Sequence, residues 1–501
     1  MRVLFIDPPG MQKPLKNKPG NGLNLAVATL APVLLKHGHQ VSLFDMANHY
    51  ECRSIEFIRN SLSVYKPDII GISILNAQYE RAVTVIKRLR TITSLPIIVG
   101  GAEITAVEDK IFHDTDYAVD ISVLGEGEES LVKIIECIQG NQTAALESID
   151  GIIINKNRRL IKTGSPQINK DISGYPYPIF DVFGVKNIKN YMTVASRGCP
   201  FNCSFCFKYQ GNTWRCRSPE KIIEELIEAR KRYCFDVVRF EDANFNFKPE
   251  WTRSACDAIM KSELYGIHWE AGLRADKIDK ALCEHMVAAG CQKVCIGVES
   301  LHPEVFKLIK KGETIDQIKK GVKIAQEYFK QVQLFIVIGL PGDTKKRALH
   351  TYREAMKLGN VTISCSLAVP YSNTRLETWV NENATVHGSS YDSFTRGTSA
   401  YYSGVSFETK DFTKKDRLKV FHKYHINSNK YITKSKYRFL TPFVWMKDAL
   451  YHDPLHIHRH MLNICVRVIN EFSDIMKLSR KDAPKEDIDY LRVPDGSWWI
   501  G

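Results

Sequence analysis

The chain has 501 residues, a formal net charge of +13, 44% hydrophobic residues and 25% charged residues. This composition is typical of a soluble globular protein, and the length predicts two to four domains. Its 13 cysteines lack the compact, even spacing of a secreted disulfide scaffold. The opening residues predict a buried strand rather than a signal peptide, and no apolar run reaches the ~20 residues of a membrane span. We therefore expect a cytoplasmic protein.

Short apolar segments alternate with helical patterns over residues 1–145. A helix over Arg81–Arg90 is predicted by apolar residues that share one face. Strand–helix alternation of this kind predicts an α/β fold with a doubly wound parallel sheet, which binds ligands beyond the carboxyl ends of its strands. The candidate strands are Val3–Ile6, Val41–Phe44, Asp68–Ile74, Ile97–Val99 and Ile121–Leu124.

The loops at these strand ends are rich in glycine but contain no phosphate-binding motif. Neither G-x-G-x-x-G after the first strand nor G-x4-G-K-[ST] occurs, so we expect no dinucleotide. Gly100, Gly101, Gly125 and Gly127 would let a large flat ligand approach the backbone closely.

Residues 146–188 predict a hairpin followed by a linker. Ile152–Asn155 and Leu160–Lys162 flank a turn, and the region after Pro166 has little periodicity. The linker leads into a second series of alternating strands and helices over residues 189–378.

The first strand of that series is followed by Cys199, Cys203 and Cys206, spaced C-x3-C-x2-C. Full ligation of a [4Fe–4S] cluster takes four thiolates, so three would leave one iron open to bind a small molecule and pass it an electron. A structural zinc site takes four ligands, usually as two close pairs, and no second pair at that spacing follows.

This motif, with the aromatic Phe205 just before its last cysteine, resembles that of the radical S-adenosylmethionine (radical SAM) superfamily. The resemblance implies a [4Fe–4S] cluster, SAM bound at the open iron, and a partial TIM barrel over residues 189–378. Catalytic groups are then expected at the carboxyl ends of the barrel strands. The candidate barrel strands are Met192–Ala195, Val237–Phe240, His268–Ala271, Val294–Gly297 and Gln333–Ile338.

The same resemblance implies a set of SAM-binding residues. Glu241 and Asp242 end the second strand, where the superfamily binds the SAM amino group, although the following Ala243 departs from the pattern and leaves this loop open. Glu299 ends the fourth strand, and Arg274 stands where relatives often carry an arginine near the SAM carboxylate. Residues 339–342 resemble the signature of the sixth strand. The implied SAM-binding residues are Phe205, Glu241, Asp242, Arg274, Glu299 and Gly339.

The phrases KPDIIGIS, PIIVGGAEIT and VLGEGEESL make residues 1–145 similar to the cobalamin-binding domain of cobalamin-dependent radical SAM enzymes. The chain lacks the D-x-H-x-x-G motif, which implies cobalamin without a cobalt-ligating histidine from that motif. A scaffold that has lost its cofactor is the alternative, because fold resemblance alone does not establish a site. The implied cobalamin-binding residues are Ser73, Asn76, Gly100, Gly101, Glu103, Gly125, Glu126 and Gly127.

Together the two modules resemble class B radical SAM methyltransferases. The resemblance implies that a 5′-deoxyadenosyl radical from SAM removes a substrate hydrogen and that cobalamin supplies a methyl group to an unactivated carbon or a phosphorus. We expect a monomer, a flavodoxin or ferredoxin as electron donor, and a small-molecule, lipid or natural-product substrate.

Three alternatives stay open. The first is a radical oxidase, cyclase or rearrangement enzyme that uses both cofactors without methyl transfer. The second is methylthio transfer to RNA, which ranks low because only Cys52 and Cys137 precede the central motif. The third is a non-enzymatic cobalamin or Fe–S binding or sensor module.

Residues 379–501 carry no motif that we interpret mechanistically, and we expect a mainly helical region that caps the barrel and shapes the substrate pocket. A helix is predicted over Arg459–Lys477, preceded by four histidines whose spacing does not favour a metal site. Between Lys410 and Arg438, ten lysines and arginines stand against two aspartates. This basic run is typical of a solvated helix face, and we expect no nucleic acid as a partner.

Overall fold

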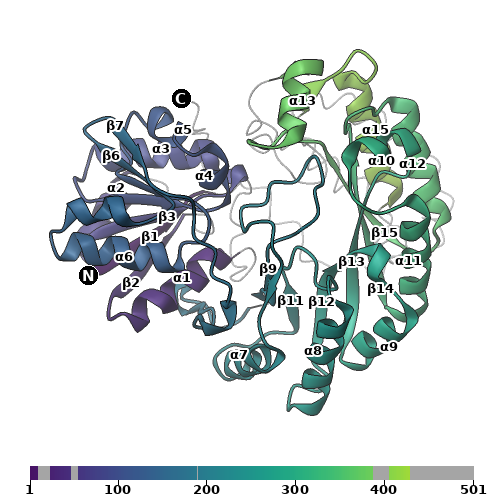
Figure 1. Cartoon of the computed structure of the whole chain (residues 1–501), viewed down its shortest axis with the longest axis horizontal. Coiled ribbons are helices and arrows are strands. Elements are labelled where there is room, and N and C mark those ends of the chain that lie inside the picture. The colour runs from purple at the N-terminus through teal and green to yellow at the C-terminus, as the bar shows by residue number, and fades with distance from the viewer. Residues whose placement is uncertain (10–22, 47–54, 189, 388–404, 429–501) are drawn as a thin grey trace, which may run out of the picture. The chain divides into compact units, whose positions relative to one another are not determined.

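The computed structural model describes residues 1–9, 23–46, 55–188, 190–387 and 405–428 (Figure 1). The predicted helix over residues 459–477, the histidines before it and the basic run beyond residue 428 lie outside these ranges. Within them, every helix is too short or too polar to cross a lipid bilayer.

The first sheet has seven strands in the order β2-β1-β3-β4-β5-β6-β7 (Figure 1). Five of them are parallel, with Val3 of β1 opposite Val41 of β2 and Ile69 of β3, and the last two join the edge antiparallel. The order of the parallel strands is that of a flavodoxin-like sheet, which confirms the predicted doubly wound fold. The strands are β1 (Arg2–Asp7), β2 (Gln40–Asp45), β3 (Ile69–Ser73), β4 (Ile97–Gly100), β5 (Ile121–Val123), β6 (Ile152–Lys156) and β7 (Arg159–Lys162).

Helices cover both faces of this sheet because both faces of its strands are apolar. Val3 and Phe5 pack with α1 and α6, whereas Leu4 and Ile6 pack with α2 and α3. Asn24 caps α1 by accepting a hydrogen bond from the amide of Ala26 at 3.1 Å. The helices are α1 (Leu25–Lys36), α2 (Ile55–Tyr65), α3 (Tyr79–Arg90), α4 (Ala102–Val107), α5 (Lys110–Asp114) and α6 (Glu128–Gln139), with 3-10 turns η2 (Asn76–Gln78) and η3 (Thr143–Ser148).

The predicted hairpin is β6 and β7, which extend the first sheet rather than stand apart from it. The linker after it contains the 3-10 turns η4 (Ile172–Gly174) and η5 (Asp181–Phe183). Phe180 in this linker is fully buried against Tyr191 and Tyr233, with ring centroids 5.5 and 6.0 Å away. The linker thus packs onto the start of the second sheet.

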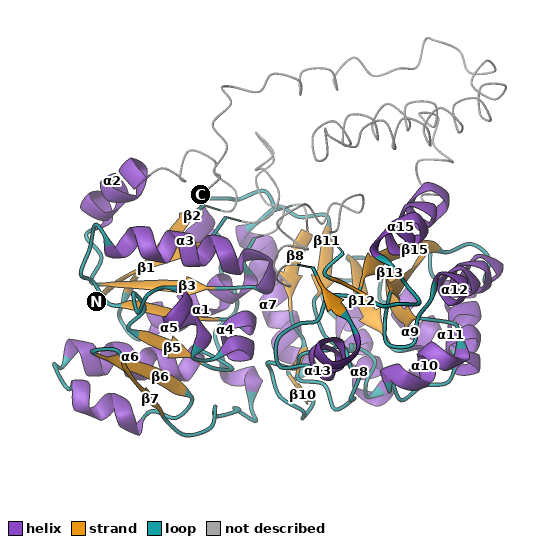
Figure 2. Ribbon diagram, turned by 90° about the horizontal axis from the view of Figure 1, so that it is seen from above, coloured by secondary structure: helices purple, strands orange, loops and turns teal. Residues whose placement is uncertain are grey.

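The second sheet has six parallel strands that follow one another in chain order (Figure 2). They are β8 (Asn190–Thr193), β11 (Val237–Phe240), β12 (His268–Leu273), β13 (Cys291–Glu299), β14 (Gln331–Ile338) and β15 (Thr362–Leu367). A two-stranded ribbon of β9 (Ser196–Arg197) and β10 (Arg215–Cys216) lies between β8 and α7 in sequence. This arrangement is the predicted partial barrel.

Helices separate the strands of this second sheet, as expected for a barrel. Helix α7 begins with Pro219 after the cap Ser218, whose side chain accepts from the amide of Lys221. The helices, with one 3-10 turn, are α7 (Pro219–Arg232), α8 (Pro249–Lys261), η6 (Ala275–Lys277), α9 (Lys280–Ala288), α10 (Pro303–Ile309), α11 (Ile315–Tyr328) and α12 (Lys345–Lys357).

Two features of this barrel differ from the sequence prediction. The strand β15 was not among the candidate strands. Gly339 follows β14, the fifth strand, so its assignment to a sixth-strand signature is wrong. Gln333–Ile338 was already the fifth candidate strand, so the sixth-strand assignment came from the resemblance of residues 339–342 to the family signature and not from the strand pattern.

The described part of the C-terminal region covers the end of the barrel. It contains α13 (Arg375–Asn383), the paired strands β16 (Thr385–Val386) and β17 (Phe407–Glu408), and α15 (Lys414–Ser428). Tyr424 of α15 is buried and donates to the carbonyl of Ala348 in α12 at 2.9 Å. In the part of the basic run that is described, Lys414 and Lys415 are exposed whereas Arg417 is buried.

Candidate functional site

The loop that carries the three cysteines leaves the β9–β10 ribbon through Gly198. This glycine has a φ of +81°, and a Cβ atom there would lie 2.1 Å from the carbonyl oxygen of Thr213. Only glycine fits such a position. The amide of Cys199 then donates to the carbonyl of Gly211 at 3.2 Å, which folds the loop back on itself.

The far side of the cysteine loop is fastened to two helices. The amide of Ser204 donates to the carbonyl of Ile309 in α10 at 2.9 Å, and its own carbonyl accepts from the amide of Leu376 in α13 at 2.8 Å. The Arg375 guanidinium also donates to the carbonyl of Asn202. The backbone around the cysteines is therefore held from both sides.

The three thiols lie close enough to influence one another's ionisation. Burial raises the pKa of Cys206 to about 11, and the neighbouring Cys203 and Cys199 add to this shift. Burial also raises the pKa of Cys203, against the opposing charge of Lys311. The side-chain amide of Asn244 contacts the Cys199 sulfur at 3.1 Å. A bound cation would favour the thiolate forms of Cys203 and Cys206 here.

This donor set fits a [4Fe–4S] cluster better than a single ion. Among the described residues, no three His, Cys, Asp or Glu side chains converge on one metal position. Three thiolates that each ligate a different iron do not need to converge. The residues that would hold the cluster are Cys199, Cys203 and Cys206, and this assignment stays a prediction.

Asp242, which is predicted to bind SAM, also holds the start of the cysteine loop. It is buried and accepts from the amide of Ala195 at 3.0 Å and from the Ser196 hydroxyl. Burial raises its pKa to about 6, although these hydrogen bonds act in the opposite direction. Glu241 next to it is exposed and pairs with Arg239 at 2.6 Å. Their roles toward SAM stay a prediction.

Arg274 is the centre of a buried charged cluster beside the cysteine loop. Its guanidinium lies 3.4 Å from the ring centroid of Phe201, the middle of the three residues between the first two cysteines. Its Nε donates to Asp276 at 3.0 Å, and its terminal nitrogen lies 3.6 Å from Glu313. The predicted residue therefore faces the cysteine loop, stacked on one of its aromatic rings.

Glu299 ends β13 in a strained conformation. Its φ is +61°, which is rare for a residue with a side chain, and the pairing with β14 shifts register at this point. The carboxylate lies 3.4 Å from the Lys311 ammonium, which also lies 3.5 Å from Glu313. Burial raises the pKa of Glu299, and Lys311 acts against that shift. Such strain is common at ligand sites.

Phe205 and Gly339 are the two other residues predicted to bind SAM. Phe205 is partly buried against the core. Gly339 has a φ of +89°, and a Cβ atom would lie 2.3 Å from the Arg417 guanidinium. The C-terminal helix α15 thus covers this glycine, whose role toward SAM stays a prediction.

The carboxyl edge of the first sheet brings together the glycines and polar residues predicted to meet cobalamin. Gly101 has a φ of +103°, and a Cβ atom there would lie 2.7 Å from the Ile74 carbonyl and 3.1 Å from the Ser73 hydroxyl. The Asn76 side chain donates to Glu103 at 2.9 Å, and its buried Oδ1 atom has no hydrogen-bond partner. An unsatisfied buried acceptor of this kind fits a site that a polar ligand completes.

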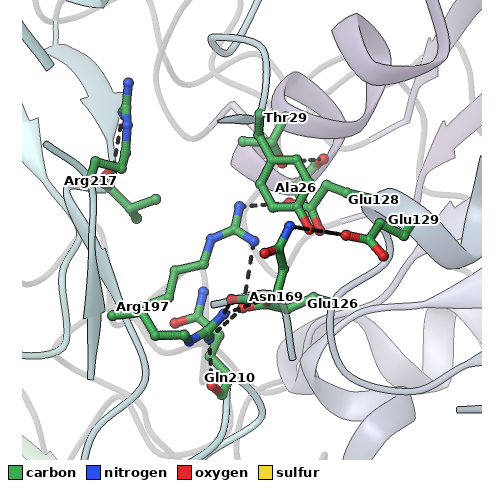
Figure 3. Close-up of polar contacts among 12 residues, drawn as sticks. Ala26, Thr29, Glu126, Glu128, Glu129, Asn169, Arg197, Gln210 and Arg217 are labelled. Atoms are coloured by element: carbon green, nitrogen blue, oxygen red, sulfur yellow. Dashed lines mark hydrogen bonds and ion pairs between the residues drawn. The ribbon is translucent and has the colours of Figure 1, made fainter. Parts of the chain in front are cut away.

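Glu126, another predicted cobalamin contact, is engaged by arginines of the barrel. Arg215 of β10 binds both of its carboxylate oxygens, at 2.7 and 2.9 Å. Arg197 of β9 lies 3.5 Å from Glu126 and 2.6 Å from Glu128 (Figure 3). Gly100, Gly125 and Gly127 lie at the same edge of the sheet, and Gly125 has a φ of +76°.

Comparison with known proteins agrees with this geometry. Residues 193–355 match the model of the Radical SAM superfamily, and residues 15–135 match the B12 binding domain. These two matches cover the cysteine loop and the carboxyl edge of the first sheet. The chain is a radical SAM enzyme with a B12-binding domain.

Two relatives and one solved structure resemble this radical SAM enzyme over most of its length. An uncharacterized methyltransferase of Pyrococcus horikoshii is 26% identical over 92% of this chain and 97% of the relative. An anaerobic magnesium-protoporphyrin IX monomethyl ester cyclase of Cereibacter sphaeroides is 23% identical over 75% of this chain and 63% of the relative. The radical SAM methyltransferase TsrM of Kitasatospora setae, solved with cobalamin and a [4Fe–4S] cluster, has a TM-score of 0.62 and 16% identity, covering 76% of this chain and 74% of TsrM.

Sequence reasoning missed several residues of this radical SAM site. Lys311 has no motif around it, yet it lies beside Cys203 and Glu299. Burial, together with the charges of Glu103 and Cys206, raises the pKa of Tyr371 to about 12, so its phenol lies near both modules. Only the folded chain brings these residues together.

The switch point of the first sheet holds a further group that is not among the predicted cobalamin contacts. Asp7, at the end of β1, is buried and accepts from Asn24 at 2.9 Å and from Gln78 at 3.0 Å. Its position after a buried strand was the one signal that could have marked it, since ligands bind at this end of the sheet.

Proposed function

We propose that this radical SAM enzyme is a cobalamin-dependent methyltransferase that methylates an unactivated carbon or a phosphorus centre of a small-molecule, lipid or natural-product substrate. The observation that carries the proposal is that the cysteine loop and the carboxyl edge of the first sheet lie next to each other. Arg197, two residues before Cys199, contacts Glu128 at the carboxyl edge of the first sheet. A ligand on that edge and a cluster on the cysteine loop would therefore lie near each other.

When bound, the cluster supplies an electron for SAM cleavage, and cobalamin supplies the methyl group. The chain's own residues position these groups and balance their charges. Lys311 and Arg274 are buried cations near Cys203, so they stabilise thiolates and can receive the SAM carboxylate. Glu299 offers a buried carboxylate that can accept from an amino or ribose hydroxyl group.

The proposal includes parts that rest on family resemblance. We expect reduction by a flavodoxin or ferredoxin, a cytoplasmic location and a monomer. The methyltransferase relative and the similarity to the TsrM fold support methyl transfer. Because another relative is a cyclase, the test must also detect oxidation or ring closure. With a substrate in hand, a mass gain of one CH2 supports methylation and a loss of hydrogen supports oxidation or ring closure.

The test is anaerobic purification with iron, sulfide and hydroxocobalamin, followed by metal analysis and reduction in the presence of SAM. We expect about four irons per chain and bound cobalt, with 5′-deoxyadenosine formed on reduction. Cys203→Ala should lose iron and 5′-deoxyadenosine formation while keeping cobalt, because the two cofactors lie on different modules.

Cys295→Ala is the matched control, because Cys295 is a partly buried cysteine of β13 outside the loop. It should keep both metals and SAM cleavage. Protein that never retains cobalt would contradict the methyltransferase proposal and leave radical chemistry standing. Protein that holds both cofactors but cleaves no SAM would instead support a sensor or binding module.

A further inference from the structure

The contact between the two modules is made by a buried group of four charged residues, which we call the clamp. It consists of Glu126 and Glu128 from the β5–α6 loop and α6, and of Arg197 and Arg215 from the β9–β10 ribbon. None of these side chains is more than 10% exposed. Surface ion pairs contribute little, but a buried pair is strongly disrupted when one partner is removed.

The two glutamates balance the charges of two arginines that would otherwise repel each other. Arg197 and Arg215 are directly opposite each other in the antiparallel ribbon. Like charges at such a position destabilise the pairing. Two carboxylates from the other module balance the two positive charges, so the ribbon and the β5–α6 loop stabilise each other.

The clamp is further supported by neighbouring polar groups. Arg215 also donates to the carbonyls of Asn169 at 2.7 Å and Gln210 at 2.9 Å. The Arg197 guanidinium lies 5.6 Å from the ring centroid of Tyr175, a linker residue. Figure 3 shows Asn169 and Gln210 gathered around the same group of arginines and glutamates. Most donors of the Arg215 fork are thus engaged.

The clamp lies next to both predicted cofactor sites. On one side, Arg197 is joined to Cys199 through the single residue Gly198, whose backbone has no room for a side chain. On the other side, Glu126 lies between Gly125 and Gly127, at the edge where cobalamin is expected. A shift of the clamp would therefore move one site relative to the other.

We propose that Glu126, Glu128, Arg197 and Arg215 are positioning residues that set the distance between the cobalamin edge of the first sheet and the cysteine loop. This inference rests on the proposed function for the identity of the two cofactors. It assigns Glu126 to the clamp rather than to a direct contact with cobalamin. SAM cleavage needs only the barrel module, whereas methyl transfer needs both sites at a fixed separation.

The first test needs no cofactor. In hydrogen exchange of the full chain, Glu128→Gln and Glu126→Gln should speed exchange at least about tenfold in residues 125–131 and also in residues 196–216, because a buried arginine loses its partner. Glu147→Gln is the matched control, since Glu147 pairs with Lys156 on the surface of the same domain. Faster exchange confined to the substituted loop, or none at all, would overturn the clamp.

The second test measures position directly. Pulsed EPR on protein holding cob(II)alamin and the reduced cluster reports the separation of the two spins. Wild type and Glu147→Gln should show one narrow distribution, and Glu128→Gln a broadened or shifted one with iron, cobalt and 5′-deoxyadenosine formation retained. If the distance distribution in the variant matched that of wild type, the glutamates would not set this distance. The same conclusion would follow if the variant lost cobalt and the molecules that kept it showed the wild-type distribution.

A double variant, Glu126→Gln with Arg215→Gln, separates the charge effect from a folding defect. It leaves no unpaired charge between these two positions, so its exchange rates should lie closer to those of wild type than those of Glu126→Gln. A double variant as perturbed as the single one would contradict an ion-pair role. If wild type binds no cobalamin, the proposed function fails, and the exchange experiment still decides whether the clamp exists.

Discussion

The two sheets present different chemistry at the carboxyl ends of their parallel strands. The barrel edge is dense in buried charge, with Arg274, Glu299, Lys311 and Glu313 grouped beside the cysteine loop. The edge of the first sheet around β1, β3 and β4 combines backbone turns such as the one at Gly101 with buried carboxyls that accept from neutral amides, as at Asp7 and Glu103.

This difference matches the two ligands that the proposed function assigns to the edges. SAM is small and carries charged amino, carboxylate and sulfonium groups, so its site needs buried counter-charges. Cobalamin is large, and a site for it needs close approach to the backbone more than ionic contacts. This difference would not hold if ligand binding at the glycine-rich edge depended on charge, or if ligand binding at the barrel edge depended on backbone shape alone.

The largest effect is expected from Lys311→Met. Lys311 is buried between Glu299 and Glu313, and its removal leaves two carboxylates without their shared cation. Breaking a buried pair costs about 3–5 kcal/mol, so thermal stability should fall and SAM binding weaken. Differential scanning calorimetry and equilibrium dialysis with SAM would measure both.

The control for this substitution is a second change in the same cluster. Lys311→Met with Glu313→Gln removes one of the stranded charges and should recover part of the lost stability. If Lys311→Met alone bound SAM as wild type does, the charged cluster would be structural and the contrast between the two edges would weaken.

A smaller effect is expected from Gly101→Ala at the other edge. With a φ of +103° and the Ile74 backbone within 2.8 Å of the added Cβ atom, alanine strains the turn by about 1–3 kcal/mol. Cobalt retention should fall while iron content stays, as metal analysis of the purified variant would show. Gly127→Ala is the matched control, because its Cβ atom would meet only Leu30 at 3.5 Å.

Equal cobalt loss in both glycine variants would mean that side-chain volume, not backbone conformation, governs that edge. Iron loss in Gly101→Ala would mean that the two edges do not act separately. Either result would contradict the difference between the two sheet edges.

How far the sequence could predict this molecule depends on the range of the interactions. Apolar periodicity predicted the parallel strands of the first sheet, and three cysteines within one loop predicted the metal site, because both patterns are local. The partner of Glu126 is Arg215, 89 residues away, and no local pattern connects them. The strand β15 was missed although Thr362–Leu367 alternates polar and apolar residues as a half-buried strand does, because it ends without a motif that marks a barrel strand.

The same reasoning explains why Gly339 was assigned to a sixth strand and why Lys311 was not among the predicted site residues. Motifs are recognised by the residues around them, whereas Lys311 lies in a loop and becomes significant only beside Glu299 and Cys203. The sequence therefore predicts which strand ends carry chemistry better than which side chains meet there.

The smallest effect concerns the pH dependence of the first sheet. Burial raises the pKa of Asp7 to about 7, above the usual value of 3.8, although Asn24 and Gln78 donate hydrogen bonds that act in the opposite direction. The folded state therefore binds a proton that the unfolded state releases between these values, and stability falls as pH rises across that window. Between pH 5 and 7 the loss is at most about 2 kcal/mol.

Asp7→Asn keeps the acceptor oxygen for Asn24 and Gln78 but cannot ionise, so it should lessen the fall in melting temperature between pH 5 and 7. Asp68→Asn is the control, since Asp68 pairs with Arg2 at 3.0 Å near the surface and its pKa is lowered. It should not lessen that fall. If Asp7→Asn and wild type lost stability in parallel over this range, Asp7 would be ionised in the folded protein. The edge of the first sheet would then carry buried charge as the barrel edge does.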